Sequence, residues 1–484
     1  MFTPSMHILE SQQIDTLIDN AFSLLENTGV RVENAGAIDL LAENGAHIDS
    51  QKKNARLTRE IIESCLKSAP DSITLYDRDG VRRMTLGNET IHFNPGSSAL
   101  SILDYTTKRQ RQPQTNDLIN ISLLTDSLSH IEMQSTSLIS GDVPIEIADS
   151  YRLFIDLQYC IKPIITGTFS ATGFEAMKAL LMVFRSGAQD LSRRPFAIFD
   201  CCPSSPLRLS DLACRNLMQC ARSSIPAEIV SMPMTGVNAP AYLSGAIVQH
   251  TAENLSALVV HQLTQPGSPV IWGGSPAAVD MRFGTTPMGA IETMMLDAAN
   301  ASIGKRLHLP THAYITLSDS KSLDAQAGLE TGMGAVIAAL SGINVISGPG
   351  MLDFERCQSL EKLVIDNEIC AMAKRLRKGI TTNTEFMRAD LSGDIYKGDH
   401  FLTSASTLDA MRTEYSYPSR VIDRRNYESW LNEDGRTVEA RAHDAVVDIL
   451  AEHEAPLPKE IDVNEMKKIM LSKAEKYGMS KLPA

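Results

Sequence analysis

One stretch decides the fold class, residues 195–234, which reads PFAIFDCCPSSPLRLSDLACRNLMQCARSSIPAEIVSMPM. It holds two short runs of apolar and β-branched residues, 195–202 and 227–234, separated by a Pro-rich turn and a longer segment. Such runs are typical of strands that are buried on both faces of a parallel sheet. The stretch therefore predicts a strand, a helix and a second, parallel strand joined by a right-handed crossover.

The same alternation recurs along most of the chain. Strands are predicted at 91–94, 131–137, 163–168, 195–202, 227–234, 269–273, 310–315 and 343–348. Eight such repeats predict an α/β fold closed as a (β/α)8 TIM-like barrel, which usually takes about 250 residues. The alternative is a doubly wound open sheet, which is disfavoured because no strand is followed by a Gly-x-Gly-x-x-Gly turn.

The two ends of the chain do not follow this repeat. Residues 1–88 are predicted to form an N-terminal extension with helices at 12–27 and 58–68 and a small β element near 72–86. Residues 89–380 would form the barrel, and residues 381–484 a C-terminal extension packed on it. We expect both extensions to be embellishments of the barrel.

Composition narrows the functional class. The 484 residues include 45 basic and 58 acidic side chains, a formal net charge of −13, and 43% of them are hydrophobic. This balance predicts a globular protein and argues against a nucleic-acid surface, which needs a basic patch. The first 20 residues show no signal pattern, and no apolar run is long enough to span a bilayer. We therefore expect a soluble, cytoplasmic protein whose eight cysteines are reduced thiols.

The carboxyl ends of the predicted strands are where a barrel of this class places its reacting groups. They are rich in Gly, Pro, Ser and Thr, and Asn94 begins the first of them. Asp200 is the one acidic residue at these ends, so no paired carboxylates are expected there. A Gly-x-Ser-x-Gly elbow, a Walker loop and a His-Glu-x-x-His helix are also absent from the sequence. Acid–base hydrolysis is therefore a poor fit.

Several side chains at these ends are candidates for ligand binding. Trp272 could form one wall of a cage for a quaternary ammonium, because a cation is attracted to the face of an indole; the alternative is a core position sealing the barrel. A carboxylate could be bound by His312 or by Arg282, whose alternatives are a core histidine and a solvated loop arginine. Cys201 and Cys202 could hold Zn²⁺ together with His312, although adjacent cysteines seldom share one ion.

Longer motifs resemble those of the trimethylamine methyltransferase superfamily over nearly the whole chain. The matching segments are GPGMLDF (348–354), SLEKLVIDNE (359–368), SDSK (318–321), DAQAG (324–328), HFNPGS (92–97), WGG (272–274) and the C-terminal HFL (400–402) with TL (407–408). The fold implied by this resemblance is also an α/β barrel.

The resemblance has implications for the chemistry. The trimethylamine branch of the superfamily carries pyrrolysine in the Gly-Met-Leu-acidic segment, and Phe354 stands at that position here. This departure removes the pyrrolysine-dependent activity and indicates the branch that includes glycine betaine, proline betaine and carnitine methyltransferases. These pass an N-methyl group to the Co(I) form of a corrinoid, so we expect the cobalamin to be supplied by a partner corrinoid protein. No bound metal is expected.

The expected function is methyl transfer from glycine betaine, giving dimethylglycine, in a site that positions its substrate without acid/base residues. The candidate substrate-binding residues are Trp272, His312, Phe354, Asn94, Arg282 and Gly350, the last through backbone N–H groups. The alternatives are proline betaine or carnitine as donor, a zinc-dependent methyltransferase, and a betaine-binding module without catalysis. A homo-oligomer is expected, with neither a nucleic acid nor a membrane as partner.

Overall fold

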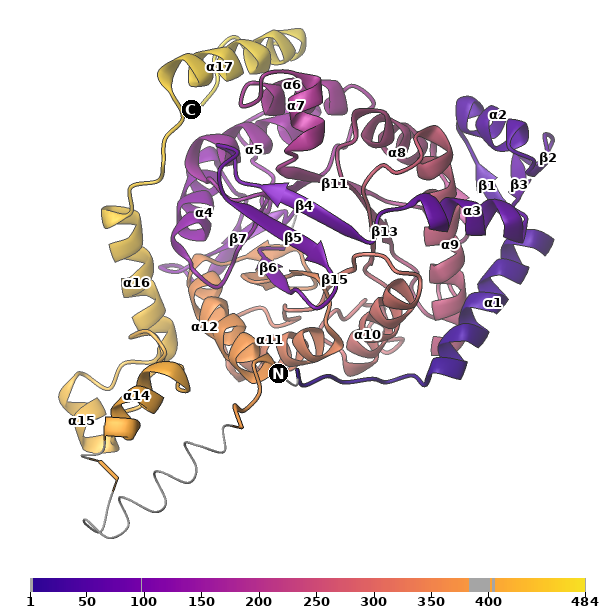
Figure 1. The fold of residues 1–484 in the computed structure, drawn as a ribbon. Coiled ribbons are helices and arrows are strands. Elements are labelled where there is room, and N and C mark those ends of the chain that lie inside the picture. Colours follow the sequence, from indigo (N-terminus) through magenta and orange to yellow (C-terminus); the bar gives the residue numbers. More distant parts are fainter. Residues whose placement is uncertain (1–2, 97, 383–400, 403–404, 484) are drawn as a thin grey trace.

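The computed structural model describes residues 3–96, 98–382, 401–402 and 405–483. Its centre is a barrel of eight parallel strands, seen end-on in Figure 1. They are β6 (His92–Asn94), β9 (Gln134–Ser135), β10 (Ile164–Thr166), β11 (Ala197–Cys201), β13 (Ala227–Ser231), β14 (Val270–Gly274), β15 (His312–Tyr314) and β16 (Val345–Ser347). Each lies within or beside one of the eight predicted runs, so the predicted α/β barrel is confirmed.

The strands close into a ring in chain order. Parallel pairing runs from β9 through β10, β11 and β13 to β14, and from β15 through β16 to β6. A bridge between Trp272 and Thr311 joins β14 to β15, and the Phe93 carbonyl accepts hydrogen bonds from the amides of Glu132 and Met133 beside β9. The open-sheet alternative is therefore excluded.

Helices surround the barrel in the connections between strands. They are α4 (Thr115–Ser127), α5 (Ile145–Tyr159), α6 (Gly173–Met182), α7 (Ala188–Arg193), α8 (Asp211–Ser223), α9 (Leu243–Thr264), α10 (Ile291–Arg306), α11 (Ala325–Ser341) and α12 (Leu360–Arg377). Side-chain caps fix where several begin: Ser210, Asp324 and Ser359 each accept a hydrogen bond from a first-turn amide.

One end of the barrel is closed by a hairpin. Strands β4 (Ser72–Tyr76) and β5 (Arg83–Gly87) pair in antiparallel fashion and cross this end in Figure 1. Ile73, Leu75 and Leu86 of the hairpin form one buried cluster with Met133, Ile165, Ile198, Ile271 and Val345 of the barrel. This end is therefore filled by apolar side chains, and the strands terminate at the other end.

A second, smaller sheet stands at that open end. Its order is β17 (Met351–Leu352), β18 (Cys357–Gln358), β7 (Ser101–Asp104) and β8 (Arg109–Arg111). The turn between β17 and β18 has three successive residues in the left-handed region, Asp353, Phe354 and Glu355, with φ of 51°, 58° and 65°. This conformation disfavours side-chain-bearing residues, so the turn is a strained element at the barrel mouth.

The chain ends pack on the outside of the barrel. The N-terminal part comprises α1 (Ser11–Asn27), β1 (Val30–Val32), α2 (Ala35–Glu43), β2 (His47–Asp49), β3 (Asn54–Arg56) and α3 (Arg59–Ser68). It lies against α9, and β12 (Arg208–Leu209) from a barrel loop joins its sheet beside β1.

The C-terminal part comprises α14 (Ala405–Thr413), α15 (Tyr427–Asn432), α16 (Val438–Glu452), α17 (Glu460–Ala474) and a 3-10 turn (Glu475–Tyr477). Helix α16 lies beside α4 and α12, and α17 beside α5 and α6 (Figure 1). The division at residues 88 and 380 stays a prediction, and His400 of the C-terminal motif lies outside the described residues. No helix in the described part of the chain is long and apolar enough to cross a membrane.

Candidate active site

The polar side chains inside the barrel are placed by strand alternation. Ile198, Ile271 and Val345 belong to the cluster inside the barrel. Residues two positions further along a strand point to the same side, so Asp200, Gly273 and Ser347 also face the interior, closer to the mouth. Glu228 and His312 meet there, with Nδ1 of the histidine 2.8 Å from Oε1 of the glutamate and both side chains fully buried. The barrel floor is thus apolar, and the layer above it is ionisable.

A chain of hydrogen bonds fixes the histidine tautomer. The Asn94 amide donates to the Ile346 carbonyl at 3.2 Å, which leaves its Oδ1 to accept the Ser347 hydroxyl at 2.9 Å. Ser347 Oγ can then only accept from Nε2 of His312, 2.9 Å away. The proton of the neutral imidazole therefore sits on Nε2, and Nδ1 presents a lone pair to Glu228.

This tautomer requires a proton on Glu228. An ionised carboxylate would face the Nδ1 lone pair at 2.8 Å, whereas a carboxylic acid can donate to it. Burial acts in the same direction, raising the pKa of Glu228 to about 8 and lowering the pKa of His312 to about 4. The contact is not an aligned hydrogen bond as it stands, because neither atom has one among the described residues. The pair is consequently neutral at neutral pH.

Asp200 completes this layer beside Glu228. Burial, together with the charge of Glu228, raises the pKa of Asp200 well above its usual range, and its Oδ1 has no hydrogen-bond partner among the described residues. Tyr314 lies 3.4 Å from Oδ2 through its hydroxyl and packs edge-on against the His312 ring, with centroids 4.7 Å apart. The expectation that the mouth lacks paired carboxylates is therefore wrong: Glu228 lies within a strand, where a search of strand ends does not find it.

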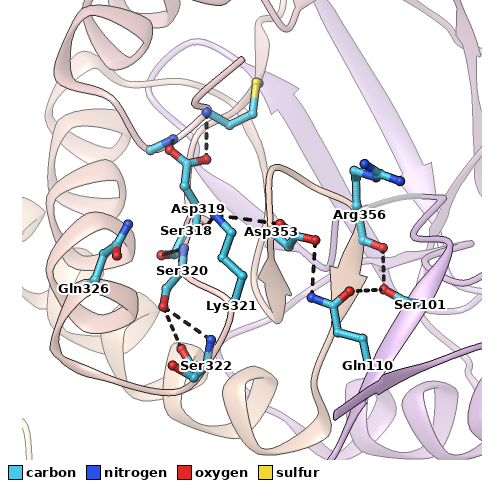
Figure 2. A network of polar contacts seen from close by, with 12 residues as sticks. Ser101, Gln110, Ser318, Asp319, Ser320, Lys321, Ser322, Gln326, Asp353 and Arg356 are labelled. Carbon is cyan, nitrogen blue, oxygen red and sulfur yellow. Dashed lines mark hydrogen bonds and ion pairs between the residues drawn. The ribbon is translucent and has the colours of Figure 1, made fainter. Parts of the chain in front are cut away.

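Figure 2 shows a second polar network at the rim, which brings together two of the family-like motifs. Asp319, in the loop after β15, accepts hydrogen bonds from the amides of Met288 and Gly289 at 2.8 and 2.9 Å. Lys321 of the same loop lies 3.8 Å from Asp353, and its ammonium is 3.9 Å from the centre of the Phe354 ring. The ring of Phe354 is thus already in contact with a cation at the rim.

Two further carboxyl groups near this rim lack partners. Both oxygens of Asp297, on α10, and Oε1 of Glu355, beside Phe354, are buried without a hydrogen-bond partner among the described residues. Burial raises the pKa of Glu355 to about 8, and burial with the charge of Glu355 raises that of Asp297 well above its usual range. A positively charged ligand at the mouth would reverse these shifts.

Three of the predicted binding residues lie away from the mouth or have their donors engaged. Trp272 points outward from β14, where its indole N–H donates to Asn300 on α10 at 2.6 Å and the ring is fully buried. Arg282 is 80% exposed and forms an ion pair with Asp280 at 2.6 Å. The backbone N–H of Gly350 is taken by Asp366 at 2.7 Å.

The structure does bring Asn94 and His312 together, through Ser347, and places Phe354 at the rim. Gly273 faces His312, and a Cβ there would lie 3.1 Å from Nδ1, so a larger residue would displace the ring. Tyr314 and Ser347 stand at the ends of predicted strands, but sequence reasoning missed Glu228 as a member of this cluster. A carboxylate in the otherwise apolar run of β13 was the signal that could have found Glu228.

The proposed zinc ligands are not assembled. Cys201 points outward, toward Cys220 of α8, whereas His312 lies beside Glu228 and Gly273 inside the barrel. Among the described residues, no group of three or more His, Cys, Asp and Glu side chains has the arrangement of a metal site.

Comparisons with known proteins point to one family. A family model described as trimethylamine methyltransferase (MTTB) matches residues 2–476. Trimethylamine methyltransferase MttB of Methanosarcina thermophila is 30% identical over 96% of this chain and 96% of its own length. A glycine betaine methyltransferase of Desulfitobacterium hafniense is 29% identical over 95% of each chain. The crystal structure of the monomethylamine methyltransferase MtmB of Methanosarcina barkeri superposes with a TM-score of 0.54 at 9% identity, covering 92% of this chain and 89% of MtmB.

Proposed function

Because the chain belongs to the trimethylamine methyltransferase family, whose members are enzymes, we propose that it moves an N-methyl group from a small quaternary amine to the corrinoid of a partner protein. Glycine betaine is the first candidate for the donor, with dimethylglycine as the product. A relative named for this substrate is 29% identical over 95% of this chain. Proline betaine and carnitine share the same trimethyl- or dimethylammonium chemistry and are the other candidates.

A quaternary ammonium suits a site without a dedicated acid. Its nitrogen is already alkylated, so attack on one methyl carbon breaks the carbon–nitrogen bond and expels a neutral amine. The corrinoid supplies the Co(I) nucleophile for that attack. The task of this chain is to hold the methyl group in line and to exclude water, which is where positioned side chains accelerate a displacement.

The observation that carries the proposal is the layer of buried, neutral carboxyl groups under an aromatic side chain. Burial raises the pKa of both Asp200 and Glu228 and so favours their protonated forms. A quaternary ammonium beside Tyr314 would favour their ionised forms and gain both a counter-charge and an aromatic face. Such a cation needs no hydrogen-bond donor or acceptor, which fits Oδ1 of Asp200 and both oxygens of Glu228, since these have no hydrogen-bond partner among the described residues.

Phe354 supports a quaternary rather than a tertiary amine. By the resemblance of its motif, it corresponds to the position that carries pyrrolysine in the trimethylamine branch, and its ring faces the Lys321 ammonium at 3.9 Å. A phenyl ring cannot react with an amine and so cannot turn it into a better leaving group. A quaternary ammonium does not need this activation, because its nitrogen is already alkylated.

The test is spectroscopic. Purified protein is mixed with a Co(I) corrinoid protein and, separately, with glycine betaine, proline betaine, carnitine, choline and trimethylamine. Loss of the Co(I) absorbance and growth of the methyl-Co(III) spectrum with one quaternary amine would support the proposal and identify the donor. Activity with trimethylamine alone would contradict it, as would betaine binding without methyl transfer to any corrinoid protein.

A further inference from the structure

We infer that Arg152 binds the carboxylate of a zwitterionic substrate and thereby selects betaines over quaternary amines without an acid group. This inference rests on the proposed function and names the group that recognises the second half of the substrate. Arg152 lies in the middle of α5, and its guanidinium reaches the carboxyl ends of β9 and β10.

The guanidinium is held in place by neutral groups. Nη1 donates to the Ser98 hydroxyl oxygen at 2.7 Å and to the Thr136 carbonyl at 2.8 Å, and Nη2 donates to the Gly167 carbonyl at 3.0 Å. Gly167 lies beside Asp200 of the neighbouring strand β11, since a Cβ at Gly167 would lie 3.4 Å from Cβ of Asp200. These bonds place the cation beside the mouth.

Arg152 has no counter-ion in contact with it in the described part of the chain. The residue is only 2% exposed, and an arginine in such a place is normally paired with a carboxylate. Three carboxyl groups lie near enough to act on its charge without touching it: Asp149, which pairs with Lys473 at 2.9 Å, Asp156, whose Oδ1 accepts from Ser122 and Gln134, and Asp200 in the barrel layer. The Nε–H is buried and has no acceptor among the residues that the structure describes.

The free donors have the geometry that a carboxylate needs. A guanidinium carries five N–H groups, of which three are used here, so Nε–H and one N–H of Nη2 remain. Two such donors can bind both oxygens of one carboxylate. Phe169 stacks on the guanidinium, 4.4 Å from its ring centre, and is itself 43% exposed, so its side chain can move aside for a ligand.

Arg185 shows what a purely structural arginine looks like in this protein. Its guanidinium donates four hydrogen bonds to the backbone carbonyls of Arg194, Arg78, Phe184 and Asp77, and Nε is among the donors. It lies beside the turn of the hairpin at the closed end of the barrel. Arg152, at the open end, is the buried arginine that keeps a free edge. Because Arg282 is solvent-exposed and His312 is bound to Ser347, Arg152 replaces both as the expected carboxylate donor.

The experiment measures binding of three ligands by calorimetry to the full chain and to Arg152→Met. The ligands are glycine betaine, choline, which has the same trimethylammonium but no carboxylate, and tert-butylacetate, which has the carboxylate but no charge on its branched end. We expect the variant to bind glycine betaine and tert-butylacetate about tenfold to hundredfold more weakly, because it loses a charge-assisted pair of hydrogen bonds. Choline binding should be unchanged.

Two controls separate recognition from folding. Arg185→Met also removes a buried guanidinium and should lower the melting temperature without changing the preference for betaine over choline. If Arg152→Met does not fold, Arg152→Lys keeps the charge without the planar fork and should weaken both carboxylate ligands only. The inference would be overturned if the affinities for all three ligands fell equally, or if none of them fell.

The proposed function can fail independently of this inference. Binding of tert-butylacetate through Arg152, with no methyl transfer from any quaternary amine, would leave the carboxylate site in place and refute the activity. If Arg152→Met transferred the methyl group of betaine as fast as the wild type does, the activity would be supported and the carboxylate site at Arg152 refuted.

Discussion

The hydrogen-bond chain from Asn94 to His312 leaves Glu228 as the group whose protonation responds to pH. Its carboxyl pKa is raised to about 8 in the folded protein because the side chain is buried, while an unfolded chain restores the ordinary value. The stability that the protonated pair contributes is therefore present in full below that ordinary pKa. It is lost as the pH rises to about 8, because ionisation then puts a charge into the barrel.

Glu228→Gln should remove this dependence, since a glutamine amide can donate to Nδ1 of His312 as the acid does. Thermal melts between pH 6 and pH 9 are the measurement. We expect the melting temperature of the wild type to fall over this range and that of the variant to fall less. Parallel curves for the two proteins would show that Glu228 does not hold the proton.

Trp272 provides the opposite case, a residue expected to bind substrate that lies in the core. Trp272→Phe removes the indole N–H that donates to Asn300 and leaves a small void beside Gly304. We expect a loss of about 1–3 kcal/mol in unfolding free energy, measured by denaturant titration, with kcat/KM per folded molecule unchanged. A large fall in kcat/KM without a loss of stability would instead indicate that Trp272 contributes to substrate binding.

At the scale of elements, the strands were predictable because five of the eight predicted runs are rich in apolar or β-branched residues, as expected in a sheet buried on both faces. The face of the sheet on which a side chain lies was harder to predict, because an error of one residue in the position of a strand moves every side chain to the opposite face. Trp272 was expected at the mouth for its place near a strand end, yet Ile271 takes the inward position and turns the indole outward. Strands β17 and β18 have two residues each, too few for any periodicity. Arg152 was missed because it reaches the mouth from within a helix.

The junction between α4 and β9 depends on one lysine. The Lys162 ammonium donates to the carbonyls of Thr125, Leu128 and Ile131 at 2.5, 2.7 and 2.6 Å, which end the helix and lead into the strand. Lys162→Met would leave three carbonyl oxygens unsatisfied, and we expect it to lower the unfolding free energy by about 3 kcal/mol or more. Lys178→Met, on α6 with one hydrogen bond to Ser223, is the matched control and should cost much less. Equal losses in denaturant titrations would contradict this role.

For the molecule as a whole, the two ends of the barrel have different surfaces. The hairpin seals one end, so under the proposed function both the amine and its methyl acceptor would use the other. Large apolar side chains stand exposed on the loops there: Phe169 after β10, Met232 after β13, and Met281 and Phe283 after β14. Met281 and Phe283 are each 76% exposed, and apolar groups that gather around an opening are typical of an interaction site.

If the methyl acceptor docks on these loops, Met281→Glu combined with Phe283→Glu should slow methyl transfer to the corrinoid protein at least about tenfold, because two charges replace apolar contacts. The affinity for glycine betaine, measured by calorimetry without the partner, should stay the same, since neither side chain reaches the carboxyl layer of the barrel. Val81→Glu, on the exposed turn of the hairpin at the sealed end, is the control and should change neither quantity. A rate that falls equally in both variants would mean that charge alone, wherever it lies, weakens the encounter. A rate that is unaffected by the mouth variant would place the docking surface elsewhere on the barrel.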